Sequence, residues 1–166
     1  MDLKWEDIKS STKTTDEYLK YIKEKDNMIK NFEDYTPKKE ILDHIKKFLS
    51  ENNQKLKILV IGAEWCHDCA KRVPNMTKIM KQINTNRIQF EVLYGVKTNP
   101  FHKEDEPLWH KTHSPPEATN PKFDLEAIPT FYFFNKEGRF LGRIIERPEE
   151  NSTLEEDILE ILHDNL

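Results

Sequence analysis

The residues whose types and spacing could do chemistry are Cys66 and Cys69, the only two cysteines in the chain. They come shortly after an apolar run and stand where a helical pattern begins. Side chains three residues apart on the first turn of a helix share a face, so these thiols could form a disulfide with little backbone movement. Unpaired N–H groups and the positive end of the helix dipole favour a thiolate there, and thiolate is the nucleophile. The spacing predicts a dithiol that forms and breaks a disulfide reversibly.

The composition places this dithiol in a helix-rich globular protein. The chain has 166 residues, 36% apolar and 34% charged, with four glycines and a net charge of −4, which suits one domain with its own core. No apolar run is long enough to span a bilayer, and residues 1–30 contain no apolar segment typical of a secretory signal. Lys and Arg form no cluster. We therefore expect a cytoplasmic protein with no membrane or nucleic-acid partner.

The elements that must position the dithiol lie on both sides of it. Leu56–Ile61 is a short run of branched apolar residues, typical of a strand buried on both faces. Helical spacing continues from Cys66 to about Ile83 despite Pro74, and apolar residues alternate from Arg87 to Tyr94 as in a second strand. This order of strand, helix and strand predicts parallel pairing.

The first 55 residues read as helical. Apolar and aromatic residues recur at roughly helical intervals over residues 2–35, which predicts one or two short amphipathic helices. Thr36-Pro37 favours the start of a further helix, with Pro at its first position, that ends near residues 51–53. We expect residues 1–55 to form a helical extension packed on a core domain of residues 56–166.

Residues 96–121 interrupt the regular pattern. The segment is rich in proline, contains three histidines and Trp109, and predicts a long excursion with one short helix near Lys103–His110. Trp109 could either anchor this loop or meet a partner. We treat the segment as an insertion in the domain.

The last part of the chain predicts a hairpin and a helix. Thr130–Phe134 and Arg139–Ile145 read as two strands joined by a turn that contains Gly138. Ser152 and Glu155 have the spacing of a capping box for a final helix.

Three segments together resemble the thioredoxin family. Residues 59–69 are similar to the strand and Trp-Cys-x-x-Cys site of that family, and Pro74 falls where its active-site helix is kinked. Residues 120–130 resemble a helix end followed by the Ile-Pro-Thr segment, and the hairpin and final helix follow in the same order. The resemblance covers about residues 56–163 apart from the excursion.

This resemblance implies an α/β protein with the thioredoxin-like fold: a central mixed four-stranded sheet flanked by helices, here with extra N-terminal helices. It also implies a cis peptide bond between Ile128 and Pro129 that faces the dithiol, leaving the Ile128 backbone to pair with an extended substrate. We expect Trp65 to cover the site and contact the substrate.

The chain departs from the family at three places. Val60 stands where many members have a buried acid, and Gly62 stands where an aromatic residue is common. His67-Asp68 replaces the Gly-Pro pair between the cysteines, and these two side chains have opposite effects on a Cys66 thiolate. We expect His67 and Asp68 to tune the dithiol, and Glu64 and Asp68 are the nearest substitutes for the missing acid.

The resemblance and the dithiol together predict a thiol-disulfide oxidoreductase. Cys66 would be the nucleophile and Cys69 the resolving thiol, with the Cys66–Cys69 disulfide as the redox group and no other cofactor. The expected substrates are disulfides of proteins or small molecules, and the expected reductant is a thioredoxin-reductase-type enzyme or a low-molecular-weight thiol.

Two alternatives remain open at this stage. The first is a binding or adaptor module that keeps the fold without turnover. The second is a zinc protein, in which one Cys-x-x-Cys supplies two ligands and histidines supply the others. Its candidate ligands are His67, His102, His110 and His113.

Overall fold

A computed structural model describes residues 1–166 and has a five-stranded mixed sheet at its centre. The order of the strands is β1-β3-β2-β4-β5. Only β2 and β3 run parallel, and the other neighbours are antiparallel. The strands are β1 (Lys13–Thr14), β2 (Leu56–Ile61), β3 (Ile88–Leu93), β4 (Thr130–Phe134) and β5 (Phe140–Ile145). The α-helices are α1 (Thr15–Ile22), α2 (Asp26–Asp34), α3 (Lys39–Glu51), α4 (His67–Ile83) and α5 (Leu154–Asn165).

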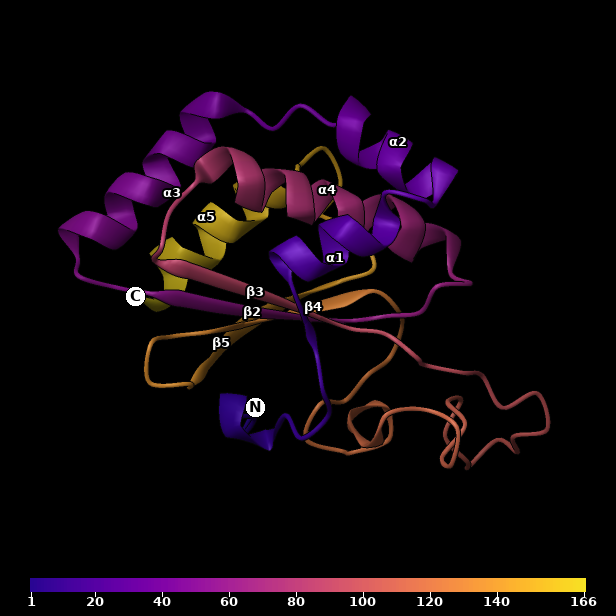
Figure 1. The fold of residues 1–166 in the computed structure, drawn as a ribbon. Coiled ribbons are helices and arrows are strands. Elements are labelled where there is room, and N and C mark those ends of the chain that lie inside the picture. Colours follow the sequence, from indigo (N-terminus) through magenta and orange to yellow (C-terminus); the bar gives the residue numbers. More distant parts are fainter.

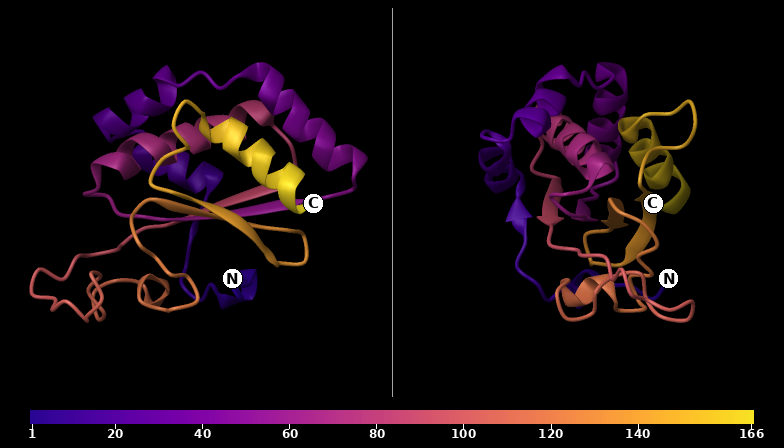
Figure 2. Two further views of the ribbon diagram at one scale, coloured as in Figure 1. Left: turned by 180° about the vertical axis from the view of Figure 1, so that it is seen from behind. Right: turned by 90° about the vertical axis from the view of Figure 1, so that its right-hand side faces the viewer.

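All five α-helices lie over one face of the sheet (Figure 1). The opposite face is covered by the N-terminal segment and by the long connection between β3 and β4, as Figure 2 shows from two further directions. These coverings contain only the short 3-10 turns Trp5–Asp7 and Pro116–Ala118. The Trp5 ring packs edge-on against Phe134, with ring centroids 5.4 Å apart. The sheet is thus buried on both sides although its helices occupy one.

The strands and helices around the dithiol are where the sequence predicts them. Strands β2 and β4 have the predicted bounds. Strand β3 is one residue shorter than predicted at each end, and β5 begins one residue later than predicted. Helix α4 begins at His67 and continues through Pro74 to Ile83. The sequence predicts four strands, and the structure adds β1 as a fifth. In β1, Lys13 and Thr14 pair with Val92 and Glu91 at the edge of the sheet. Two polar residues are too few to show an alternating pattern.

The predicted short helix at Lys103–His110 is wrong. These residues form turns and a hairpin-like loop, in which Thr98 bridges Trp109 and the Asn99 N–H donates to the Leu108 carbonyl at 2.8 Å. Pro107 lacks an N–H and disfavours helical backbone at the residue before it. Between β3 and β4 there is also no α-helix whose end could fall at residues 120–126.

Two helix starts differ from the prediction. Helix α5 is capped by Thr153, whose Oγ1 accepts a hydrogen bond from the Glu156 N–H at 3.2 Å, and not by Ser152. The predicted partner Glu155 is instead buried, accepting hydrogen bonds from the Tyr35 hydroxyl and the Lys38 N–H. Helix α3 begins at Lys39, two residues after Pro37, because Lys38 still has extended backbone.

Buried polar contacts tie the coverings to the rest of the molecule. Glu117 is 2% exposed, and its carboxylate accepts hydrogen bonds from the Lys9 N–H, the Ser10 N–H and the Ser10 hydroxyl. Trp109 is also buried, and its Nε1 donates to the Leu125 carbonyl at 2.7 Å. Trp109 therefore anchors the insertion. None of the helices is both long and apolar enough to cross a membrane.

Candidate active site

Cys66 is the N-cap residue of α4. It follows the four-residue connection Gly62–Trp65 from the end of β2, and its backbone is extended (φ −83°, ψ 123°). The Cys66 Sγ accepts a hydrogen bond from the Cys69 N–H at 3.3 Å. Both cysteines are free thiols and both are buried, Cys66 at 9% and Cys69 at 0% exposure. The helix start thus brings the two sulfurs together and turns its free N–H groups toward the first of them.

The pKa values of the two thiols are shifted in opposite directions. The Cys69 thiol donates a hydrogen bond to the Cys66 sulfur, and together with the Cys69 and Asp68 N–H groups it lowers the pKa of Cys66 to about 7. The same contact raises the pKa of Cys69, because its proton is held by Cys66 and the thiol is also buried. Near neutral pH one thiolate and one thiol share the site, and the thiolate is on Cys66.

The Ile128–Pro129 bond is cis, as predicted, and it faces Cys66. The Cys66 Sγ lies 3.6 Å from the Ile128 carbonyl oxygen, to which a Cys66 thiol donates. The Ile128 N–H donates to no backbone carbonyl, because Ile128 lies two residues before β4 begins. The Ile128 N–H is therefore an unpaired backbone donor beside the Cys66 sulfur.

The residues on either side of Cys66 border the site. The Trp65 side chain is 56% exposed, and its Nε1 donates to the Val96 carbonyl at 2.8 Å. His67 is exposed and Asp68 is half-buried in the first turn of α4. The Asp68 carboxylate acts against the hydrogen bonds and raises the pKa of Cys66.

The histidines do not gather around the dithiol. No group of three or more His, Cys, Asp or Glu side chains in the structure is arranged to hold a metal ion. His110 and His113 stack on each other in the insertion, with ring centroids 4.3 Å apart.

The sequence comparison decides the family. The sequence model of the family described as Thioredoxin matches residues 12–94, half of the chain. The chain belongs to the thioredoxin family. A comparison with curated proteins found no match.

Two solved structures show the same fold as this thioredoxin-family chain. A protein of unknown function from Pseudomonas aeruginosa is 17% identical, covers 85% of this chain and 84% of its own length, and has a TM-score of 0.53. An HIV epitope-scaffold is also 17% identical, with coverage of 86% of both chains and a TM-score of 0.53. A thioredoxin from Fasciola hepatica is 20% identical over 74% of this chain and 91% of its own length, with a TM-score of 0.41.

Compared with the thioredoxin pattern, the most informative departure is Gly62. A Cβ atom at this position would lie 2.8 Å from the Cys69 Sγ and 3.1 Å from Cε1 of Tyr94. The absent side chain leaves room for the Tyr94 ring beside Cys69. The Tyr94 hydroxyl in turn pairs with the Tyr18 hydroxyl of α1 at 2.8 Å. Burial raises the pKa of both tyrosines, so both hydroxyls are neutral at ordinary pH.

The sequence did not single out Tyr94 or Tyr18. In the sequence, Tyr94 is the last residue of a predicted strand, and Tyr18 is one of the aromatic residues at helical intervals over residues 2–35. A glycine between a buried strand and the dithiol was the available signal, because it marks a close approach by another group.

No acidic side chain takes the place of the buried acid that Val60 replaces. Val60 is fully buried in β2 between Val92 and Phe131 of the neighbouring strands. The suggested substitute Glu64 is exposed and forms an ion pair with Lys25 at 2.8 Å. Lys25 and Tyr21 hold the pKa of Glu64 below its usual value, so it remains ionised. Of the two nearest acids, Glu64 is therefore bound to Lys25 at the surface, whereas the Asp68 carboxylate raises the pKa of both thiols.

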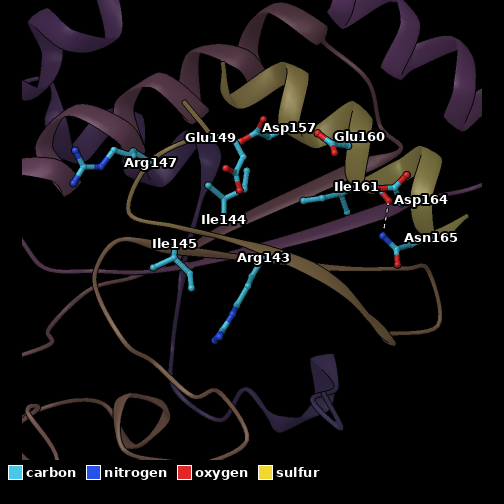
Figure 3. A pocket seen from close by; sticks show the side chains of 10 residues that line it. All are labelled: Arg143, Ile144, Ile145, Arg147, Glu149, Asp157, Glu160, Ile161, Asp164 and Asn165. Atoms are coloured by element: carbon cyan, nitrogen blue, oxygen red, sulfur yellow. Dashed lines mark hydrogen bonds between the residues drawn. The ribbon is translucent and has the colours of Figure 1, made fainter. Parts of the chain in front are cut away.

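Two grooves of similar volume differ in their distance from the dithiol. A groove of about 340 Å³ lies beside Trp65 and is also lined by Lys13, Tyr21 and Lys97. A separate groove of about 310 Å³ lies between β5 and α5, where acidic side chains such as Asp157, Glu160 and Asp164 line it (Figure 3). Figure 3 shows that the Arg143 side chain extends away from these acidic groups. Only the first groove adjoins the dithiol.

Proposed function

We propose that this thioredoxin-family protein is a thiol-disulfide oxidoreductase that reduces disulfides of proteins or small molecules. The observation that carries the proposal is the contact between the two thiols. Cys66 has a pKa of about 7 while Cys69 retains its proton, so one nucleophile and one resolving thiol are ready in the same site. No cofactor other than the Cys66–Cys69 disulfide is required by this chemistry.

In the first step the Cys66 thiolate attacks one sulfur of the substrate disulfide. A bond forms between Cys66 and that sulfur, the substrate S–S bond breaks, and the other substrate sulfur leaves as a thiolate that takes a proton from water. The Ile128 N–H is free to pair with the substrate backbone beside the sulfur, and the Ile128 carbonyl becomes free once Cys66 has lost its proton. We expect Pro129 and the exposed Trp65 ring to contact the substrate there.

In the second step Cys69 loses its proton and attacks Cys66. The mixed disulfide breaks, the second substrate thiolate leaves, and Cys66 and Cys69 become a disulfide. Two electrons have then passed to the substrate. An external reductant, either a thioredoxin-reductase-type enzyme or a low-molecular-weight thiol, supplies two electrons to restore the dithiol. A reducing compartment such as the cytoplasm favours this direction.

His67 and Asp68 are proposed as tuning residues for the first step. Asp68 opposes thiolate formation at Cys66, whereas a protonated His67 would favour it. Replacing Asp68 by Asn should therefore lower the pKa of Cys66 and leave the order of the two steps unchanged.

Two cysteine variants test the mechanism with insulin or a small disulfide as the substrate. Cys66→Ser should abolish reduction, and Cys69→Ser should accumulate a mixed disulfide that mass spectrometry detects at Cys66. Full reduction by Cys66→Ser would overturn the proposal. The measured reduction potential of the wild-type dithiol, together with turnover by a thioredoxin reductase, would identify the direction and the reductant.

The two alternatives predict different results. An adaptor would show no turnover yet would co-elute with a specific partner in both cysteine variants. A zinc protein would contain stoichiometric zinc that is lost in the double cysteine variant. In the structure, the two thiols belong to no group of three or more His, Cys, Asp or Glu side chains arranged to hold a metal ion.

A further inference from the structure

The groove beside Trp65 continues into a larger hollow over α1. The two share Lys13 and Tyr21, and the larger hollow has a volume of about 1130 Å³. The connection Ala63–Trp65, which forms one wall of the groove, leads directly into Cys66. The opposite wall comes from residues 94–97, to which Trp65 is fixed by its hydrogen bond to Val96. A substrate held at Cys66 would therefore reach this groove within about one to three residues.

Lysine side chains dominate the combined surface. Six lysines line the two hollows against four carboxylates, in a protein whose overall charge is −4. The lysines are Lys13, Lys20, Lys23, Lys25, Lys81 and Lys97, and the acids are Asp16, Glu17, Glu24 and Glu64. Positive charge is thus concentrated beside the dithiol and is not a property of the whole molecule.

Three of the four acids already have partners within the protein. Glu64 pairs with Lys25 at 2.8 Å and Asp16 pairs with Lys81 at 2.9 Å. Glu17 accepts a hydrogen bond from the Thr14 N–H at the start of α1. Glu24 is the one acid of the surface without such a contact. The two ion pairs neutralise Lys25 and Lys81, so Lys13, Lys20, Lys23 and Lys97 remain against Glu17 and Glu24, and the surface keeps an excess of positive charge.

Lys13 and Lys97 are the lysines of the groove nearest Trp65, and neither forms an ion pair. The Lys13 Nζ lies 5.3 Å from the centre of the Tyr21 ring, and the Lys25 Nζ lies 5.5 Å from the same ring. Tyr21 thus holds an unpaired ammonium group at the edge of the groove. This ammonium and that of Lys97 are available to an anion.

We propose that this lysine-lined groove, defined by Lys13, Tyr21, Trp65 and Lys97, binds acidic side chains of the substrate. The preferred substrates would be disulfides with Asp or Glu one to three residues from the attacked cysteine, in an extended segment. This inference rests on the proposed oxidoreductase function and names its substrate class. Opposite charges at a partly enclosed surface raise association rates, and added salt weakens the effect.

Three disulfide peptides of one length test the substrate class. Their flanking residues are acidic, neutral or basic, and kcat/KM is measured at low and at high salt. At low salt the acidic peptide should be favoured over the neutral one by roughly three- to tenfold, and high salt should remove most of that preference. Equal rates for the acidic and basic peptides at low salt would overturn the proposal.

A pair of double variants assigns the preference to the groove. In Lys13→Gln/Lys97→Gln the ratio of acidic to neutral rates should fall to about one. The control is Lys46→Gln/Lys55→Gln, which removes two exposed lysines at α3 and before β2, and it should keep the wild-type ratio. A wild-type ratio in the groove variant would contradict the assignment.

A binding measurement separates this inference from the proposed function. The Cys66→Ser protein cannot turn over, so quenching of tryptophan fluorescence reports binding of the reduced peptides alone. Tighter binding of the acidic peptide, lost in the groove variant, supports the inference even if no peptide is reduced by the wild-type protein. Equal binding of all three peptides sinks the inference, whatever the turnover.

Discussion

The hydroxyl groups of Tyr18 and Tyr94 are 2.8 Å apart, and their rings meet edge to face with centroids 5.6 Å apart. Tyr18 comes from α1 and is completely buried, whereas Tyr94 follows β3 and reaches the cysteines through the space above Gly62. A partly buried hydrogen bond therefore joins α1 to the strand end behind the dithiol.

This pair should behave as a coupled unit in unfolding. Tyr18→Phe or Tyr94→Phe leaves the other hydroxyl without its partner and should cost about 1–2 kcal/mol of unfolding free energy. The double variant removes both hydroxyls, so its loss should be smaller than the sum of the single losses by about 1 kcal/mol. Urea denaturation of the four proteins measures this. Additive losses would show that the hydrogen bond contributes nothing.

The pH dependence of Cys66 should follow its lowered pKa. Because only the thiolate reacts, alkylation of Cys66 by iodoacetamide should be half-maximal near pH 7 and fall about tenfold per pH unit well below it. The Cys69 thiol is the largest cause of the low value, so in Cys69→Ala the midpoint should move upward. An unchanged midpoint in that variant would exclude the thiol contact as the cause.

Gly62→Ala should disturb the dithiol by crowding the Cys69 sulfur. The new Cβ would lie 2.8 Å from the Cys69 Sγ, so either the sulfur or the Tyr94 ring must move. Overpacking of this kind costs about 1–3 kcal/mol. We also expect slower attack by Cys69, seen by rapid quenching as a longer-lived mixed disulfide.

Gly142→Ala is the matched control for that variant. Its Cβ would meet carbon atoms of Ile161 at 3.5 Å, an ordinary contact. Thermal unfolding and the lifetime of the mixed disulfide should stay near the wild-type values. If both glycine variants behave alike, the crowding at Cys69 is not the cause.

Trp109 should hold the insertion in place. Its ring is buried and its Nε1 bonds to Leu125, so Trp109→Ala should cost about 3 kcal/mol and expose residues 96–121 to limited proteolysis. Phe101 in the same insertion is 87% exposed, and Phe101→Ala should alter neither property. A proteolysis pattern unchanged in Trp109→Ala would mean that the loop is anchored elsewhere.

The sequence determined the centre of this protein because the signals there are local. Alternation and apolar runs are sufficient to place β2, β3, β4 and β5, and the position of Cys66 at the start of α4 follows from strand and helix periodicity. The family resemblance added the cis bond at Ile128–Pro129, which the structure contains. These features depend on residues close together in the chain, so a single sequence reveals them.

The tertiary structure alone decided how distant segments meet. The edge strand Lys13–Thr14 exists only because β3 offers it unpaired backbone, and the irregular covering of one sheet face is held by contacts such as Glu117 with Ser10. Tyr18 and Tyr94 are 76 residues apart, yet their hydroxyls form one hydrogen bond. The same packing places Lys13 and Lys97 on one groove beside Trp65. Such contacts depend on how segments far apart in the sequence pack together, so the local spacing of residues does not predict them.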